Sequence, residues 1–246
     1  MSTSPTAIIT CASTCIGRAV ALAFARAGYT VLLIARSTDK LKETQKLIEQ
    51  AQGKAIIIAA DLSTTEGING CIASIKNHTS QVSVLANIAG IWHGVDEVYA
   101  GRNFDTFSQQ VILDTFFVGT IAPTLLAHAV IPLMSPKSTI INLSGTFENG
   151  GKGWLPYFVS KRAIEDLTIG LAQELAEKDI QVFGISPSDT ATEAYKKYFP
   201  EYFDDSIDPA EIATFAVSLT TPEYQTATGK IFVLKKGQKP QEAFHF

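Results

Sequence analysis

Short apolar runs alternate along the chain with longer segments in which apolar residues recur every three or four positions. The runs are almost continuously apolar, which is typical of strands buried on both faces of a parallel sheet. We predict about seven such strands, at residues 7–10, 30–35, 55–60, 82–86, 139–143, 180–185 and 230–234.

The longer segments have the period of amphipathic helices. Repeated strand–helix units with right-handed crossovers predict an α/β fold. Its architecture is a Rossmann-like doubly wound parallel sheet with helices on both faces, in one domain over residues 1–246. Ser63 and Glu66 have the spacing of a capping box, and Asp208 precedes a proline at the first position of a helix. We predict helices at 16–27, 38–52, from 63 towards 77, at 104–131, 157–178, and from 208 onwards.

The segment 188–207 departs from this alternation, because it is long and lacks a clear strand. Loops of this length are usually functional or disordered, so we predict a substrate lid here. The lid would carry the aromatic residues Tyr195, Tyr198, Phe199, Tyr202 and Phe203.

Composition narrows the class of protein. The 246 residues are 46% hydrophobic and 18% charged, which predicts a folded core rather than a disordered chain. The formal net charge of −4 argues against nucleic acid as a partner. Cys11, Cys15 and Cys71 are too few for a disulfide framework, and the N-terminal residues lack signal-peptide features. No apolar run approaches the roughly 20 residues of a spanning helix. We therefore expect a soluble cytoplasmic protein with no membrane contact and reduced cysteines.

Ligands of a doubly wound sheet bind beyond the carboxyl ends of its strands, and several motifs fall there. The turn Thr10-Cys-Ala-Ser-Thr-Cys-Ile-Gly17 lies between a strand and a helix, as a phosphate-binding loop does. Asp61, Asn87-Ile-Ala-Gly90 and Ser144 follow the third, fourth and fifth strands, and the next predicted helix begins with Tyr157-Phe-Val-Ser-Lys161.

In their order and spacing these motifs resemble those of the short-chain dehydrogenase/reductase family over nearly the whole chain. Cys11 and Cys15 stand where two glycines of the family's T-G-x-x-x-G-x-G loop are expected, and Ser188 replaces the glycine of its P-G-x-x-x-T segment. The resemblance implies catalytic roles for Ser144, Tyr157 and Lys161, and a homodimer or homotetramer built on the two long helices. It implies cofactor contacts from Thr10, Cys11, Ser13, Cys15, Ile16, Gly17, Arg36, Asp61, Leu62, Asn87, Ala89, Gly90, Tyr157, Lys161, Pro187, Thr190 and Thr192.

The chemistry of Tyr157 and Lys161 agrees with this role. Residues four apart share one face of a helix. Reduction of a carbonyl by hydride leaves an alkoxide that needs a proton, and a nearby ammonium would lower the tyrosine pKa towards neutrality. Tyr157 would be the general acid/base, Lys161 would tune it and anchor the ribose, and Ser144 would hydrogen-bond the substrate oxygen. The alternative is a Tyr–Lys pair on the surface of an amphipathic helix.

The two cysteines weaken the phosphate loop. A side chain at a position that needs a positive φ costs about 1–2 kcal/mol. A cysteine at a helix N-terminus can also have a depressed pKa, and its thiolate would repel phosphate. Either the loop has adjusted to both thiols, or cofactor binding is impaired or redox-gated. Zinc binding is not expected, because no partner ligands are apparent.

The second strand ends at Ala35 and Arg36, where the family's NAD-binding members carry an acidic residue. A guanidinium suits a 2′-phosphate, so NADP(H) is favoured over NAD(H). Arg36 could instead be a surface charge, or stack on adenine in either cofactor.

The substrate side contains a further departure from the family pattern and many aromatic rings. Alignment on Gly119 places Phe116 where the family often has an asparagine that holds a proton-relay water; Thr115 or a water could substitute. Trp92, His93, Phe147, Trp154 and the lid rings suggest an apolar or aromatic substrate, or they fasten the lid to the body. No metal site is predicted.

Two functions fit these observations. The first is an NAD(P)-dependent oxidoreductase that transfers hydride between NADP(H) and a carbonyl/alcohol pair. The second is a catalytically impaired protein of the same fold that acts as a nucleotide sensor or interaction module. The replaced glycines and Phe116 favour the second, whereas the retained set of Ser144, Tyr157 and Lys161 favours the first.

Overall fold

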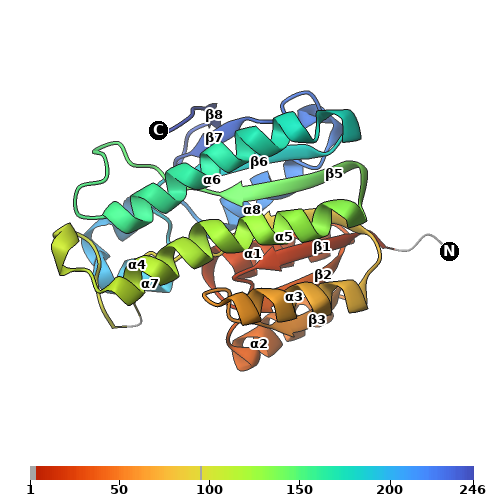
Figure 1. The fold of residues 1–246 in the computed structure, drawn as a ribbon, viewed down its shortest axis with the longest axis horizontal. Coiled ribbons are helices and arrows are strands. Elements are labelled where there is room, and N and C mark those ends of the chain that lie inside the picture. Colours follow the sequence, from red (N-terminus) through yellow and green to blue (C-terminus); the bar gives the residue numbers. More distant parts are fainter. Residues whose placement is uncertain (1–3, 95) are drawn as a thin grey trace.

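The computed structural model describes residues 4–94 and 96–246. Over these residues the strands form one eight-stranded sheet in the order β3-β2-β1-β4-β5-β6-β7-β8. All neighbours are parallel except β7 and β8. The predicted Rossmann-like parallel sheet is therefore confirmed (Figure 1). The strands are β1 (Thr6–Thr10), β2 (Thr30–Ala35), β3 (Lys54–Ala59), β4 (Val82–Asn87), β5 (Met134–Leu143), β6 (Gln181–Pro187), β7 (Ile231–Leu234) and β8 (Gln241–Glu242).

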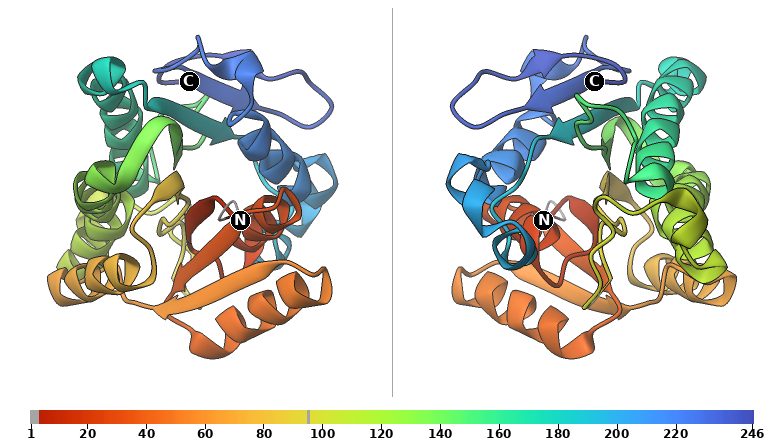
Figure 2. Two further views of the ribbon diagram at one scale, coloured as in Figure 1. Left: turned by 90° about the vertical axis from the view of Figure 1, so that its right-hand side faces the viewer. Right: turned by 90° about the vertical axis from the view of Figure 1, so that its left-hand side faces the viewer.

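Helices cover both faces of the sheet, as Figure 2 shows. On one face α1, α2 and α8 bury a core that includes Phe24, Leu41 and Phe215. On the other, α3, α5 and α6 bury a second core around Ile68 and Leu126. The helices are α1 (Cys15–Arg26), α2 (Thr38–Gln50), α3 (Thr65–His78), α4 (Gln109–Phe116), α5 (Ala122–Val130), α6 (Leu155–Glu174), α7 (Glu193–Tyr198) and α8 (Pro209–Ser218).

Three local features differ from the sequence predictions. The cap of α3 is Thr64 rather than Ser63; its hydroxyl accepts a hydrogen bond from the Gly67 amide, so the predicted capping box does not form. The predicted lid contains α7 and a 3-10 segment, Pro200–Asp205. The short strand β8 was not predicted, because two residues carry no recognisable pattern.

The long helical stretch after β4 is interrupted by a π-helical turn, Phe117–Ile121, between α4 and α5. Within the described residues, Gln109–Leu133 is the single stretch whose length and composition would suffice to span a membrane, and a third of its most apolar window is buried. The expectation that no apolar run reaches that length is therefore wrong for this helix, which contacts α3 and α6.

Candidate active site

The carboxyl ends of β1 and β4 meet where the strand order reverses, the usual ligand position in such sheets. Thr10 joins them: its buried hydroxyl accepts hydrogen bonds from the amides of Ile88 and Ala89, at 2.8 Å and 3.0 Å. The predicted turn at Asn87–Gly90 is thereby held beside the predicted phosphate loop.

Both loop cysteines adopt the left-handed conformation that glycine would take without strain. The φ angles are +58° at Cys11 and +51° at Cys15. Each therefore costs about 1–2 kcal/mol relative to glycine. The remaining glycine is required by packing, because a Cβ on Gly17 would lie 2.1 Å from the carbonyl oxygen of Cys11.

The predicted thiolate at the helix N-terminus is wrong. Burial, and next the neighbouring Cys15, raise the pKa of Cys11 to about 11. Cys15 is more exposed, and partial desolvation raises its pKa as well. Both thiols are therefore neutral near pH 7, and phosphate would meet no thiolate charge there.

The residues around this loop fit a dinucleotide. Thr14 precedes α1 but its side chain makes no capping hydrogen bond, and the first turn of α1 holds no acidic residue. The amides of a helix N-terminus attract phosphate groups. Arg36 is exposed at the end of β2, close enough to Asp61 to lower its pKa. Partial burial raises the pKa of Asp61, but hydrogen bonds from Ser63 outweigh it and hold that pKa below its ordinary value.

Lys161 lies on α6 and reaches back to the end of β5. Its Nζ donates to the carbonyl oxygen of Leu143 at 2.6 Å and lies 5.5 Å from the centre of the Tyr157 ring. Burial lowers the pKa of Lys161 to about 8, although Cys11 and Glu165 oppose it. A Cβ on Gly90 would lie 3.1 Å from this Nζ. The absence of a side chain at Gly90 therefore leaves room beside the ammonium group of Lys161.

Tyr157 stands one helical turn before Lys161, as predicted, but its pKa differs from the expectation. Burial raises the pKa of Tyr157 above its ordinary value. The predicted lowering by the ammonium is therefore wrong here. A neutral phenol remains suited to giving a proton to an alkoxide.

The hydroxyl of Ser144, which was predicted to hydrogen-bond the substrate oxygen, is engaged within the protein. Its hydroxyl is buried and hydrogen-bonded to Glu165 Oε1 at 2.6 Å and to the carbonyl oxygen of Lys161 at 3.2 Å. The neighbouring position faces the tyrosine instead: a Cβ built on Gly145 would lie 3.6 Å from the Tyr157 hydroxyl oxygen. Of the two adjacent residues, Gly145 is thus the one whose Cβ position lies beside the Tyr157 hydroxyl.

Phe116 ends α4, directly before the π-helical turn. The hydroxyl of Thr115 donates to the carbonyl oxygen of Val111 within the same helix, at 2.6 Å. Thr115 also lines a small cavity against Tyr157, together with Ile91, Tyr99, Phe107, Trp154 and Pro156.

The predicted lid packs against the body through aromatic rings. Trp92 stacks with Trp154 and with Tyr195 of α7, with ring centres 5.8 Å apart in each pair. His93 accepts a hydrogen bond at Nδ1 from the amide of Tyr99, and burial lowers its pKa to about 4. His93 is thus a neutral part of the cluster.

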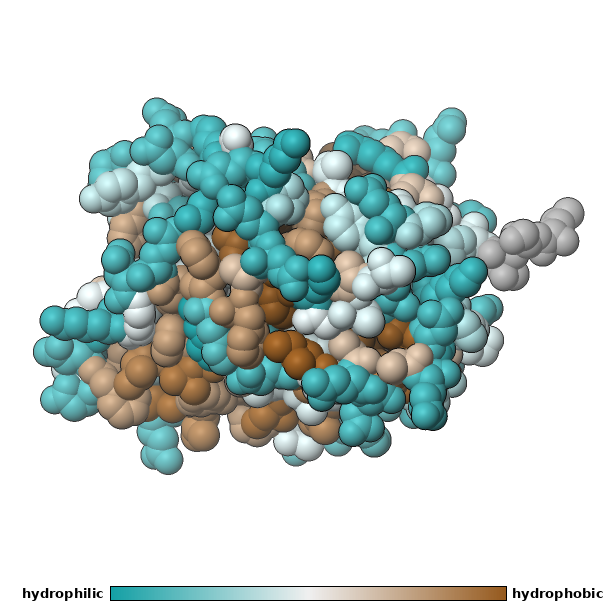
Figure 3. Space-filling model, turned by 90° about the horizontal axis from the view of Figure 1, so that it is seen from above, coloured by the Kyte–Doolittle hydropathy of each residue, from teal (hydrophilic) through white to brown (hydrophobic). Residues whose placement is uncertain are grey.

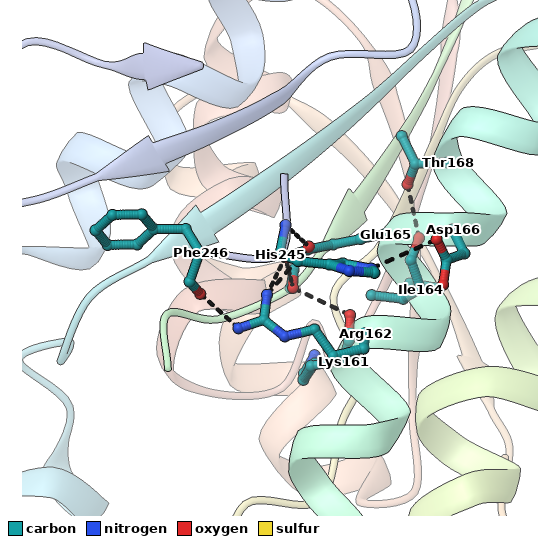
Figure 4. Close-up of polar contacts among 9 residues, drawn as sticks. Lys161, Arg162, Ile164, Glu165, Asp166, Thr168, His245 and Phe246 are labelled. Atoms are coloured by element: carbon teal, nitrogen blue, oxygen red, sulfur yellow. Dashed lines mark hydrogen bonds and ion pairs between the residues drawn. The ribbon is translucent and has the colours of Figure 1, made fainter. Parts of the chain in front are cut away.

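Sequence reasoning missed a polar cluster around Glu165, drawn in Figure 4. Glu165 is fully buried and receives hydrogen bonds from Ser144, from Arg162 at 3.1 Å and from the amide of His245 at 2.7 Å. The main-chain oxygen of Phe246 accepts from Arg162 and from the amide of Phe147. Arg162 and Glu165 have an i,i+3 spacing, but no spacing rule signals their partners His245 and Phe246, which lie about 80 residues further along the chain.

The other residues predicted to contact the cofactor lie at helix caps, in loops and at buried strand ends. Thr192 caps α7, and Thr190 donates to the carbonyl oxygen of Ser188. Ser13, Leu62 and Pro187 are buried; Ile16 lies in the first turn of α1. In the described parts of the chain, no group of three His, Cys, Asp or Glu residues could hold a metal ion.

Comparison with known proteins gives consistent matches. The profile of the short chain dehydrogenase family matches residues 5–202. A short chain dehydrogenase of Pseudocercospora fijiensis is 31% identical over 195 residues; the match covers 76% of this chain but only 60% of that protein. Glucose 1-dehydrogenase 2 of Bacillus subtilis is 27% identical, with 96% of this chain and 95% of the relative covered. The structure of L-sorbose reductase from Gluconobacter frateurii, complexed with NADPH and L-sorbose, has a TM-score of 0.83 at 23% identity, with 96% of both chains covered.

Proposed function

The chain belongs to the short chain dehydrogenase family of oxidoreductases, and we propose that it reduces a carbonyl compound with NADPH, or oxidises the corresponding alcohol with NADP+. The observation that carries the proposal is the pair on α6: Tyr157 and Lys161 face the carboxyl ends of β4 and β5 beside the bare backbone of Gly90. Lys161 is buried and Tyr157 is only partly exposed, unlike a Tyr–Lys pair on the surface of an amphipathic helix.

The cofactor, when bound, supplies or accepts the hydride. The first turn of α1 and the phosphate loop would hold its pyrophosphate, Asp61 its adenine and Lys161 its ribose. Arg36 supports NADP(H), because an exposed guanidinium at the end of β2 can pair with a 2′-phosphate and no acidic residue stands at Ala35 to repel it.

In the reductive direction Tyr157 donates its hydroxyl proton to the carbonyl oxygen as that oxygen gains negative charge. Lys161 holds positive charge next to the phenol and stabilises the phenolate that remains. The rings of Trp92, Trp154 and Tyr195 would exclude water and favour an apolar or aromatic substrate.

A second candidate function is cofactor binding with little turnover, as in a nucleotide sensor. The strained Cys11 and Cys15 and the apolar Phe116 favour it. The two functions differ in one measurement: a Tyr157→Phe variant should lose at least about 10²-fold in turnover if Tyr157 is the proton donor.

The first experiment is a calorimetric titration of the reduced protein with NADPH and, separately, NADH. We expect micromolar binding of NADPH and weaker binding of NADH, with the difference abolished by Arg36→Ala. Failure of both nucleotides to bind at millimolar concentration would overturn the proposed function. Equal binding of both would overturn the NADP(H) preference alone.

We also propose a homodimer. Leu113 of α4, Ile121 of the π-helical turn, and Leu155 and Val159 of α6 are between 36% and 44% exposed, although all are large and apolar. Hydrophobic side chains gather on this part of the surface in Figure 3, at the end away from the N-terminus, where α4 and the start of α6 lie in Figure 1. A second copy of the chain would cover them.

A further inference from the structure

The position beside the Tyr157 hydroxyl carries no side chain. A Cβ on Gly145 would lie 3.6 Å from that hydroxyl oxygen and 3.7 Å from the ring of Phe147, so a side chain here would face the reacting oxygen. Gly145 is itself buried. The space is bordered by a phenol on one side and an apolar ring on the other.

The backbone does not require this glycine. Its φ lies outside the left-handed region, unlike that of Gly150 or Gly153 nearby, so any L-residue can adopt it. Both contacts of the added Cβ are at ordinary van der Waals distance. An alanine or serine therefore fits position 145 without strain.

Three hydroxyls close to the site are engaged elsewhere. Ser144 donates to Glu165 or Lys161, Thr115 donates within α4, and Ser160 donates to the carbonyl oxygen of Tyr157 at 2.8 Å. None of the three is free to donate to a substrate oxygen without breaking a hydrogen bond. Among these groups, the phenol of Tyr157 is left as the donor to that oxygen.

We propose that Gly145 makes this a single-donor active site, which restricts reduction to carbonyls that are already electrophilic, such as 1,2-diketones and quinones. The inference rests on the proposed function. An oxygen that receives two hydrogen bonds is better stabilised as its charge develops, and loss of one such donor typically costs about 10²–10³-fold in kcat. A carbonyl activated by a neighbouring carbonyl depends less on that second donor, because its own electron withdrawal spreads the developing charge.

The test compares Gly145→Ser with Gly145→Ala on two flat probes of similar shape, phenanthrenequinone and fluorenone, with NADPH consumption as the readout. The wild-type protein should reduce the quinone and be at least about 10²-fold slower on the unactivated ketone. Gly145→Ser should raise kcat on fluorenone by about 10²-fold and change kcat on the quinone much less. Gly145→Ala, which adds the Cβ without the hydroxyl, should raise neither.

NADPH affinity is measured for all three proteins before turnover. NADPH binding with no preferential gain of the serine variant on fluorenone would overturn the inference and leave the proposed function standing. So would an equal gain from alanine, because the effect would then be one of packing. If no protein binds NADPH, both the proposed function and this inference fail.

Discussion

The two loop cysteines combine a backbone cost with a steric one. Both have a positive φ, and both thiols are neutral because burial raises their pKa. Charge repulsion of phosphate is thereby removed as a reason for weak binding. What remains is left-handed strain and the bulk of two sulfur atoms at the backbone that a pyrophosphate would approach.

The double variant Cys11→Gly/Cys15→Gly should bind NADPH about tenfold more tightly, since about 1.4 kcal/mol of relieved obstruction corresponds to that factor. Isothermal calorimetry measures it. Gln52→Gly is the matched control, because Gln52 also has a positive φ, of +62°, but lies exposed at the end of α2, far from the loop in sequence. Unchanged affinity of the double variant would show that the loop has fully adapted to its thiols.

At the residue scale, sequence patterns located most of the site but not its detailed geometry. The spacing of Tyr157 and Lys161 and the replaced glycines at Cys11 and Cys15 were visible directly. The sequence did not show which of Ser144 and Gly145 lies beside Tyr157. Side chains alternate in direction at the end of a strand, so a shift of one residue reverses the direction in which a side chain points. The pKa of Tyr157 depends on its burial, which no local pattern specifies.

At the scale of elements, α6 does more than carry Tyr157 and Lys161. Arg162 and Glu165 on the same helix bind the segment after β8, and that segment in turn receives the amide of Phe147 from the loop after β5. The Arg162 guanidinium also lies 5.1 Å from the ring of Phe147. The chain beyond β8 is thus fastened to the loop that borders the reacting hydroxyl.

Arg162→Met should destabilise the fold by about 3–5 kcal/mol, because it leaves the fully buried carboxylate of Glu165 without its cationic partner. Urea unfolding at neutral pH gives the free energy. The double variant Arg162→Met/Glu165→Gln should recover much of the loss, since no buried carboxylate is then left without Arg162. A loss below about 1 kcal/mol in the single variant would contradict this account of the cluster.

Elements with strong periodicity were predictable, and those held by distant contacts were not. The seven longer strands and the order of helices follow from apolar patterning, with ends shifted by a few residues, as at β5, which begins at Met134. The strand β8 forms only because β7 offers an edge to pair with. The π-helical turn between α4 and α5 likewise has no marker in the sequence.

For the whole molecule, the apolar surface of α4 and α6 is the feature that a single chain leaves unexplained. Leu113 and Val159 are 44% and 40% exposed, and Leu47 on α2 is exposed to a similar extent, 42%. An isolated exposed leucine needs no explanation, but a group of them on adjacent helices is typical of an interface. If two copies meet there, charges placed within that group must be buried on association and oppose it.

Leu113→Glu/Val159→Glu should therefore convert a dimer to a monomer, raising the dissociation constant by at least about 10²-fold, because each carboxylate would be buried without a partner. Sedimentation equilibrium over a range of protein concentrations gives the mass directly. Leu47→Glu, which places the same charge on an equally exposed leucine of the opposite layer, should leave the dimer intact. A monomeric wild-type protein, or a mass unchanged in the double variant, would remove this face as the interface. Loss of the dimer in Leu47→Glu as well would show that the dimer interface is not confined to the apolar face of α4 and α6.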